Sequence, residues 1–375
     1  MKARQGTMDW PLFAALLLML GFGIVLVYSS SFALAQQKYG GADFFLTRQG
    51  IRALMAFVCF MVCINVDYHL WGRWSGVAYL AAAVMLAALL FLPGNHAVNG
   101  ARRWLSLGPL QFQVSDFARM TLVVFIARKC EQANGDMKDA KVLFKHLLFV
   151  GLIGGLILLE PNFSTAAVIG IIALAMLFMS GARFWHLLAI VLSFIPVAAL
   201  LVLRTPYRRA RFMGYLDLSG TKDGIGYQVY QSLVGLGNGG LFGVGLGKGE
   251  QKLFYLPEAH TDFIFSIIGE ELGFIGLAMV IAVMIFIVWR GMRVALNAPD
   301  RLGQIMAFGF TFAVALYALI HACVASGLFP ATGLPMPFLS YGGMSLIFTM
   351  CSMGIVLNIS NHSRNRFFEA EGGRA

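Results

Sequence analysis

Long apolar segments recur along almost the whole chain and are separated by short polar ones. A bilayer core about 30 Å thick needs about 20 apolar residues to be crossed by one helix. The segments that approach this length are Pro11–Phe32, Gly50–Val66, Gly76–Leu92, Val114–Ala127, Leu147–Leu159, Ser164–Ser180, Trp185–Leu203, Leu272–Val288, Gly303–Phe329 and Tyr341–Ile359. They predict an all-α polytopic membrane protein with ten transmembrane helices, in which residues 1–375 form a single membrane domain.

Lys and Arg are distributed unequally over the predicted connections. With the N-terminus inside, 15 of them fall in the short inner segments. The short outer segments hold Lys38, Arg48, Arg102 and Arg103, with Arg52 close to the membrane boundary. Inner loops of membrane proteins carry the excess of basic residues, so both termini are predicted to be cytoplasmic. Omitting the short span Leu147–Leu159 would break this bias in the later loops.

Composition agrees with a membrane protein and excludes other classes. Hydrophobic residues make up 59% of the chain and charged residues 12%, whereas soluble proteins have about 45–50% and about 25%. The net charge of +10 is not gathered into one basic helix or patch, which argues against a nucleic-acid partner. The five cysteines form no CxxC pair and no Cys/His cluster, so they are predicted to be packing residues rather than metal ligands.

One predicted outer connection is far longer than the others and is rich in glycine. Residues 204–260 join spans seven and eight, and 11 of the 30 residues from Gly220 to Gly249 are glycine. Gly235–Gly240 matches GxGxxG by letter, but no strand pattern precedes it, and Gly243–Lys248 lacks the spacing of a P-loop. Neither is read as a nucleotide site. Long ordered loops are usually functional, and glycine density could let backbone N–H groups approach a phosphate.

Ionisable residues inside or next to the apolar segments gather on the predicted outer side. Charges in a bilayer are costly and mark functional candidates by default. The group comprises Asp116, Arg119, Glu160, Asp262, Glu270, Glu271 and His321. Some of these have a structural interpretation as well: Asp116 and Arg119 could form an i,i+3 ion pair that locks two helices, and His321 could be a hydrogen-bonded core residue.

Asp262 stands out because it lies where the glycine-rich loop meets the eighth span. Glu258, His260 and Asp262 fall within five residues. The same loop carries several lysines and arginines, among them Lys248 and Lys252. Thr261 or Asp262 could instead be the N-cap of the following helix. A carboxylate at the water–lipid boundary with cations nearby favours a functional site, because it can act as a general base.

Four motifs, in order along the chain, resemble signatures of the SEDS family (FtsW, RodA and SpoVE). They are Gly100–Trp104, Gly226–Leu233, Leu256–Gly273 and Thr332–Gly343. The resemblance covers nearly the whole chain. The sequence Ala259-His260-Thr261, followed by Gly269-Glu270-Glu271, is more similar to the division member FtsW than to the elongation member RodA.

The resemblance implies a peptidoglycan glycosyltransferase in the bacterial cytoplasmic (inner) membrane. Such an enzyme polymerises lipid II, an undecaprenyl-pyrophosphate disaccharide-pentapeptide, into glycan strands at the outer face of that membrane, here in cell division. A class B penicillin-binding protein transpeptidase is the implied partner, together with other divisome proteins. The family's essential aspartate maps onto Asp262, which would act as the general base of an inverting transfer.

The other candidate residues are assigned around this reaction. Charge developing on the pyrophosphate needs cations or backbone donors, or a bound divalent cation such as Mg²⁺ or Mn²⁺. Trp104 could stack on a sugar or anchor the chain at the interface. The predicted substrate-binding residues are Arg102, Arg103, Trp104, Lys248, Lys252, Glu258, His260 and Ser340, and the predicted supporting residues are Asp116, Arg119 and Glu270.

Some positions depart from the family motifs, and three other functions are kept as alternatives. The departures, whose roles stay open, are Val114, Asp116, Arg119, Asn162 and Met344.

An elongation polymerase of the RodA type would use the same chemistry. A lipid II flippase or transporter would need a polar path through both leaflets, whereas the ionisable groups cluster in the outer half. A non-catalytic scaffold would tolerate substitution of Asp262.

Overall fold

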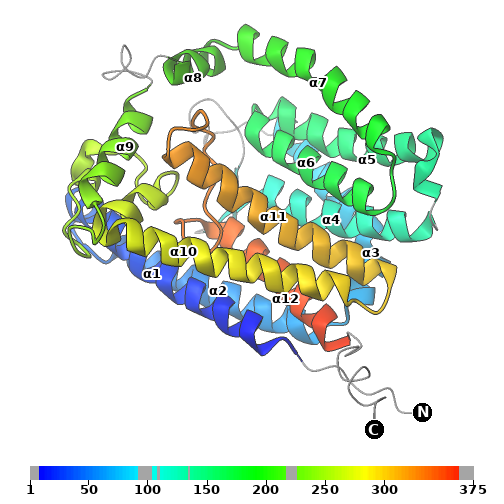
Figure 1. The fold of residues 1–375 in the computed structure, drawn as a ribbon, viewed down its shortest axis with the longest axis horizontal. Coiled ribbons are helices and arrows are strands. Elements are labelled where there is room, and N and C mark those ends of the chain that lie inside the picture. Colours follow the sequence, from blue (N-terminus) through cyan, green and yellow to red (C-terminus); the bar gives the residue numbers. More distant parts are fainter. Residues whose placement is uncertain (1–7, 92–103, 108–109, 134–135, 217–225, 363–375) are drawn as a thin grey trace.

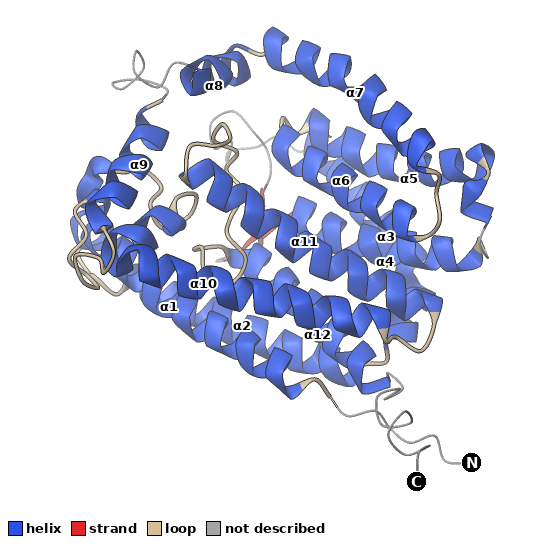
Figure 2. Cartoon of the chain, viewed as in Figure 1, coloured by secondary structure: helices blue, strands red, loops and turns tan. Residues whose placement is uncertain are grey.

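The computed structural model describes residues 8–91, 104–107, 110–133, 136–216 and 226–362 of the chain (Figure 1). Most of these residues are helical (Figure 2). The long helices are α1 (Trp10–Tyr39), α2 (Phe44–Asn65), α3 (Tyr68–Phe91), α4 (Val114–Gln132), α5 (Ala140–Leu159), α6 (Phe163–Met179), α7 (Phe184–Arg204), α10 (Ile264–Leu296), α11 (Arg301–Ala325) and α12 (Gly343–His362). The shorter elements are α8 (Pro206–Leu216), α9 (Tyr227–Gly239), the one-turn helices η1 (Asp136–Lys138) and η2 (Gln251–Tyr255), and the antiparallel hairpin of β1 (Trp104–Leu107) and β2 (Leu110–Gln113).

Each predicted span coincides with one long helix, which confirms the all-α polytopic fold. Eight of these helices are long and apolar enough to cross a membrane, by length and composition. The other two are α6, which has 17 residues, and α4, which carries charged residues at both ends. The count of ten crossings therefore stays a prediction.

The shortest predicted span, Leu147–Leu159, belongs to a helix of 20 residues, α5. The helix begins earlier than the apolar run because Asp139 caps it, and the Asp139 carboxylate accepts a hydrogen bond from the backbone N–H of Lys141 at 2.9 Å. Lys141 and Lys145 in the first turns shorten the apolar run without ending the helix, since long basic side chains can extend their charged groups towards water.

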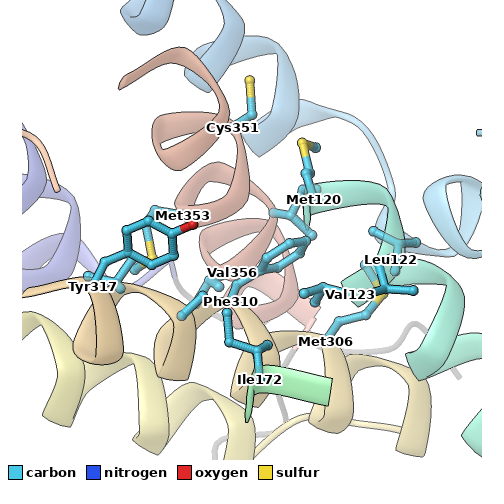
Figure 3. Packing of buried hydrophobic residues seen from close by; sticks show 14 of the residues in the cluster. Met120, Leu122, Val123, Ile172, Met306, Phe310, Tyr317, Cys351, Met353 and Val356 are labelled. Atoms are coloured by element: carbon cyan, nitrogen blue, oxygen red, sulfur yellow. The ribbon is translucent and has the colours of Figure 1, made fainter. Parts of the chain in front are cut away.

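The core of the bundle lies around α12, which is buried along most of its length. Val123 of α4, Phe310 of α11 and Val356 of α12 lie close together there (Figure 3). Gly354 lets α12 approach α2, because a Cβ at this position would lie 2.8 Å from the carbonyl oxygen of Phe60. Small residues at helix contacts are typical of membrane proteins, where lipid tails remove the hydrophobic drive between helices.

Polar contacts at one end of the bundle join the beginning of the described chain to its end. Asp9, just before α1, accepts hydrogen bonds from Arg290 of α10 at 2.8–3.1 Å. The backbone N–H of Asp9 donates to Ser360 Oγ of α12 at 3.2 Å. The first helix therefore begins where the last one ends, as an even number of crossings requires.

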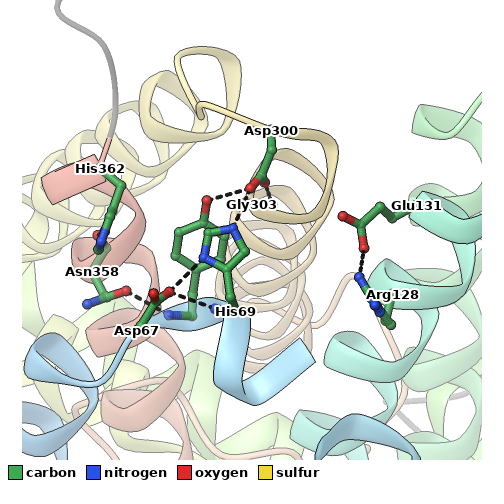
Figure 4. Close-up of polar contacts among 9 residues, drawn as sticks. Asp67, His69, Arg128, Glu131, Asp300, Gly303, Asn358 and His362 are labelled. Atoms are coloured by element: carbon green, nitrogen blue, oxygen red, sulfur yellow. Dashed lines mark hydrogen bonds and ion pairs between the residues drawn. The ribbon is translucent and has the colours of Figure 1, made fainter. Parts of the chain in front are cut away.

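A second cluster at this end of α12 ties the α2–α3 and α10–α11 connections together. The hydroxyl of Tyr68 and Nε2 of His69 both bond to the Asp300 carboxylate, each at 2.7 Å (Figure 4). His69 Nδ1 bonds to Asp67 at 2.7 Å, and the backbone N–H of Tyr68 donates to Asn358 Oδ1 at 2.9 Å. Four helices are thus fixed at the end of the molecule where α1 begins.

Helix α7 lies apart from the rest of the bundle and arches away from it with α8 (Figure 1). In the most apolar stretch of 18 residues of α7, only 6% of the residues are buried. Almost the whole surface of the helix is therefore apolar and exposed, as in a helix that faces lipid. Arg211 and Tyr215 of α8 donate hydrogen bonds to the carbonyl oxygens of Ala331 at 3.1 Å and Leu328 at 2.8 Å. These bonds anchor α8 to the connection between α11 and α12.

Candidate active site around Asp262

The described part of the glycine-rich connection, residues 226–260, packs against a bend in α10. The predicted eighth span begins at Leu272, but α10 begins at Ile264 and bends at Gly273, where φ is +68°. A bend leaves backbone groups without helical partners, and such groups cannot stay unpaired at membrane depth. Four backbone bonds satisfy them: Val244 N to Glu270 O at 3.0 Å, Gly245 N to Glu271 O at 3.0 Å, Phe274 N to Gly240 O at 2.9 Å and Ile275 N to Leu241 O at 3.1 Å.

The glycines make this backbone contact possible. A Cβ at Gly239 would lie 1.9 Å from the carbonyl oxygen of Gly269, and a Cβ at Gly243 would lie 2.2 Å from that of Glu271. Neither distance leaves room for a side chain. The glycine density is therefore explained at these positions by contact with α10, and not by approach to a phosphate.

The buried side chains of Glu270 and Glu271 hold residues 250–252 of the connection in place. The Glu270 carboxylate accepts hydrogen bonds from the backbone N–H groups of Glu250 at 2.8 Å and Gln251 at 3.2 Å. The Glu271 carboxylate accepts one from Ser29 Oγ of α1 at 2.6 Å and forms an ion pair with Lys252. Glu270 therefore holds the backbone of the connection at Glu250 and Gln251, and its supporting role in the reaction stays a prediction.

Lys252 lies in a position that differs from the one expected of a substrate-binding residue. Its side chain is 1% exposed and that of its partner Glu271 is 0% exposed. The positive charge of Lys252 is thus paired with Glu271 inside the protein. By contrast, Lys248 is exposed in the same connection and stays a candidate cation.

Asp262 lies in a tight turn that immediately precedes α10. The backbone N–H groups of Thr261 and Asp262 both donate to the carbonyl oxygen of Glu258, at 3.1 and 3.0 Å. Thr261 Oγ1 also donates to the Glu258 carboxylate at 3.0 Å. The side chain of Asp262 is partly exposed. The N-cap of α10 is Phe263, so neither Thr261 nor Asp262 occupies the capping position that was their structural alternative.

A second segment, residues 333–341 before α12, holds this turn. Ser340 Oγ donates to the carbonyl oxygen of Thr261 at 2.6 Å, and the backbone N–H of Tyr341 donates to that of His260 at 2.8 Å. A Cβ at Gly333 would lie 3.5 Å from Asp262 Oδ2. Ser340 is 3% exposed, so its position is that of a group that orients the turn.

His260 is buried between the aromatic rings of Phe45, at the start of α2, and Tyr341, just before α12. Its ring centroid lies 4.9 Å from that of Phe45 in α2 and 5.4 Å from that of Tyr341. Burial lowers the pKa of His260, and the negative charge of Glu258 opposes this only in part. The imidazole is therefore neutral at neutral pH and contributes to the packing of the Asp262 turn.

The side chains of three predicted substrate-binding residues lie outside the described part of the chain. Arg102 and Arg103 lie outside the described residues. Trp104 is the first residue of β1, where its backbone is paired with Gln113, and its side chain is outside the described part of the chain. Substrate contacts by these three residues stay predictions.

Asp116 and Arg119 form the ion pair that their spacing allows. Arg119 Nη2 lies 3.8 Å from Asp116 Oδ1, and both side chains are buried at the start of α4. The guanidinium also lies 4.5 Å from the ring centroid of Tyr317 in α11 and donates to Thr349 Oγ1 of α12 at 3.4 Å. A small cavity lined by Arg119 and Pro337 connects this pair with the segment that precedes α12. The pair thus joins three helices behind the site.

The other departures from the family motifs, and His321, have local structural partners. Val114 is the first residue of α4 and is fully buried, and Met344 packs against the core. The Asn162 side chain caps α6 by accepting a hydrogen bond from the backbone N–H of Thr165 at 3.4 Å. His321 Nδ1 bonds to the carbonyl oxygen of Leu334 at 2.9 Å, in agreement with its structural interpretation.

The sequence gives no signal for three residues of α2 that border the site. Phe45 and Arg52 contact His260 and Tyr341, and Gln49 lies on the same face of α2 by its helical spacing. Only the contact with segments more than 200 residues away identifies them. Among the residues that the structure describes, no group of three or more His, Cys, Asp or Glu side chains could hold a metal ion, so a divalent cation stays a prediction.

Sequence comparisons identify the family. Residues 9–365 match the FtsW/RodA/SpoVE family model, described as "Cell cycle protein". The chain is 39% identical over 345 residues to a protein of Geobacter sp. (strain M18) named "Probable peptidoglycan glycosyltransferase FtsW", with 92% of this chain and 94% of that protein covered. It is 36% identical over 366 residues to stage V sporulation protein E of Bacillus subtilis (strain 168), with 97% and 100% covered.

Solved structures share the same fold. The rod shape determining protein RodA of Thermus thermophilus is 26% identical, with a TM-score of 0.71 over 96% of this chain and 98% of that one. A chain of the structure described as "Structural coordination of polymerization and crosslinking by a peptidoglycan synthase complex" is 25% identical, with a TM-score of 0.78 over 94% and 98%. With a family model that spans nearly its whole length, this chain is a member of the FtsW/RodA/SpoVE family of cell cycle proteins.

Proposed function

We propose that this chain is a peptidoglycan glycosyltransferase that polymerises lipid II into glycan strands at the outer face of the bacterial cytoplasmic membrane, in cell division. The family and the names of its relatives support the reaction, and the similarity to Geobacter FtsW supports division rather than elongation. The observation that carries the proposal is the placement of Asp262, a partly exposed carboxylate held by two loop segments at one end of the bundle.

Asp262 lies at the end of the bundle opposite to Asp9. Asp9 bonds to Arg290 near the far end of α10, whereas Asp262 immediately precedes that helix. The stretch from Ile264 to Arg290 would span about 40 Å at 1.5 Å per residue, which is the full thickness of a bilayer with its headgroups. If the termini are cytoplasmic, as the distribution of basic residues predicts, Asp262 faces the compartment where glycan strands are made.

The reaction requires a base for the acceptor hydroxyl. In the proposed step a sugar hydroxyl oxygen bonds to the anomeric carbon of the donor, and the bond from that carbon to the diphosphate oxygen breaks. The electron pair of this bond leaves with the diphosphate, and the hydroxyl proton passes to the Asp262 carboxylate. A single displacement of this kind inverts the anomeric carbon. Ser340 and Glu258 hold the turn that presents the carboxylate.

A class B penicillin-binding protein is the proposed partner, within the divisome. The support is the similarity to a chain from a peptidoglycan synthase complex that coordinates polymerisation with crosslinking. A polymerase at the outer face supplies the strands that a transpeptidase at the same face cross-links. Both termini on the cytoplasmic side complete the proposed topology.

The experiment is a glycan synthesis assay on purified protein in vesicles, with lipid II as the only substrate and with or without the transpeptidase. Asp262→Asn is expected to lower the rate by about 10²–10⁴, the usual contribution of a general base. Asp43→Asn is the matched control, because Asp43 is an exposed aspartate before α2 whose side chain makes no capping bond.

Three outcomes would contradict the proposal. Glycan synthesis by Asp262→Asn at the wild-type rate would show that Asp262 is not the general base. Movement of lipid II across the vesicle membrane without any glycan product would instead support the flippase alternative. Equal loss in Asp262→Asn and Asp43→Asn would point to a general effect of charge at this surface.

A further inference from the structure

Next to the Asp262 turn, one face of α2 presents a cation that forms no ion pair with any described residue and a buried amide oxygen that accepts no hydrogen bond from one. Phe45, Gln49 and Arg52 are spaced by four and three residues, so they lie on one face of the helix. Phe45 contacts the Tyr341 ring with a centroid distance of 5.2 Å, and the Arg52 guanidinium lies 4.7 Å from the same ring centroid. Gln49 lies between them on this face.

Arg52 lies beside the first residue of α12. A Cβ at Gly343 would lie 3.3 Å from Arg52 Nε. The first backbone N–H groups of a helix lack helical partners and carry partial positive charge. A guanidinium at this end is therefore unfavourable unless an anion lies between the two, and within the described residues no carboxylate is in ion-pair distance of Arg52.

Gln49 provides an independent sign that a ligand is expected here. Its side chain is 1% exposed, and its Oε1 has no hydrogen-bond partner among the described residues. A buried polar atom without a partner carries a cost of about 1–3 kcal/mol. An acceptor of this kind fits a hydroxyl or amide N–H of a sugar, whereas the neighbouring guanidinium fits the phosphate oxygens attached to that sugar.

We propose that Arg52 and Gln49, with the amino end of α12, bind the diphosphate and first sugar of a lipid-linked saccharide beside Asp262. This proposal rests on the proposed function, because the site borders the turn that presents the general base. Arg52 is joined to that turn through Tyr341, whose backbone N–H bonds to His260. A planar guanidinium can contact two phosphate oxygens at once, which lysine cannot.

The test measures binding separately from turnover. Undecaprenyl diphosphate, undecaprenyl phosphate and phosphatidylglycerol are each titrated, by native mass spectrometry, onto protein in phosphatidylcholine nanodiscs. Arg52→Gln and Arg52→Lys are compared with Lys38→Gln, a control that removes one exposed charge from the end of α1. All variants are made in the wild-type and the Asp262→Asn proteins, and their unfolding temperatures are measured.

We expect Arg52→Gln to weaken the binding of undecaprenyl diphosphate by about ten-fold or more in both backgrounds, because charge-assisted bonds to the phosphates are lost. Arg52→Lys is expected to recover part of the affinity, and Lys38→Gln to leave it unchanged. In the glycan assay Arg52→Gln should raise KM for lipid II by a similar factor.

Unchanged affinity in Arg52→Gln would overturn the proposal. So would binding of phosphatidylglycerol as tight as that of the diphosphate, which would make this a general headgroup site. A lower unfolding temperature together with weaker binding of all three lipids would also overturn it, since Arg52 would then be structural. If Asp262→Asn kept its turnover while Arg52→Gln lost binding, the general base would be wrong and the diphosphate site would stand.

Discussion

The hydroxyl of Ser340 donates a hydrogen bond to the backbone carbonyl oxygen of Thr261 at 2.6 Å, across 79 residues of sequence. The same hydroxyl accepts a hydrogen bond from the backbone N–H of Met336 at 2.8 Å. One almost fully buried side chain therefore joins the segment before α12 to the residue next to Asp262. The position of the carboxylate depends on a group in a different part of the chain.

Ser340→Ala should loosen the Asp262 turn without removing any charge. The backbone groups of Thr261 and Met336 lose their partner, which costs about 1–3 kcal/mol when such groups are buried. The expected result is a lower unfolding temperature and a lower kcat for glycan synthesis, with KM for lipid II little changed. Ser193→Ala is the control, because Ser193 Oγ bonds only within its own helix, to Ile190 O at 2.8 Å. Equal kcat values in both variants would show that the Ser340 bond does not position the turn.

Lys252→Met should destabilise the protein more than substitution of any exposed lysine. The Glu271 carboxylate would be left buried with only Ser29 as partner, and breaking a buried ion pair costs about 3–5 kcal/mol. Thermal unfolding should show a large loss for Lys252→Met and recovery when Glu271→Gln is added. Lys248→Met, at an exposed position of the same connection, should unfold like the wild type. No recovery in the double variant would argue against the pair as the cause.

Two glycines of α9 offer a matched test of the contact with α10. A Cβ at Gly239 would lie 1.9 Å from the carbonyl oxygen of Gly269, whereas a Cβ at Gly237 has no atom within 4 Å. Gly239→Ala is expected to cost about 1–3 kcal/mol or more, because backbone must move. Gly237→Ala should be neutral or stabilising, since alanine favours the helix. The measurement is the unfolding temperature in the same detergent, and similar values for the two variants would contradict the close approach.

Stability of the Asp262 turn should fall as the pH falls. Burial lowers the pKa of His260 in the folded protein below its ordinary value of 6.5. Below pH 6.5 the unfolded chain binds a proton that the folded chain does not, so acid favours unfolding, and the full stability is present above this pH. The protection of the Thr261 and Asp262 backbone N–H groups against hydrogen exchange, corrected for the slower intrinsic exchange in acid, should therefore fall between pH 7.5 and about 5.5. A profile that is the same in His260→Gln would assign the effect to another group.

The helices could be predicted from the sequence because each long apolar run must become a helix in a bilayer, where every backbone group needs a partner within its segment. α5 shows the limit of this rule, since a capped, lysine-bearing first turn extends the helix beyond its apolar run. α10 shows another limit. Glu270 and Glu271 make its beginning look like a loop, yet both carboxylates are satisfied by other parts of the chain.

The candidate site could be predicted only in part. The Glu258–Asp262 turn is local and its residues are close in sequence, so their grouping was visible. The burial of Lys252 depends on Ser29, which lies 223 residues away, and no local pattern signals it. Arg52 joins the proposed site only through its contact with Tyr341 and Gly343 at the start of α12, which depends on how α2 packs in the bundle, and Gln49 lies on the same face of α2.

The bend in α10 also has a consequence for how the protein is made. Residues 240–245 leave the ribosome before the residues around Gly273 that they pair with. Until those residues have entered the bilayer, the amides of Phe274 and Ile275 have no partner, and neither does the glycine segment. Docking of this segment therefore cannot precede synthesis of the residues around Gly273, and the turn that carries Asp262 gains its bonds to Ser340 and Tyr341 only after those residues have been made as well.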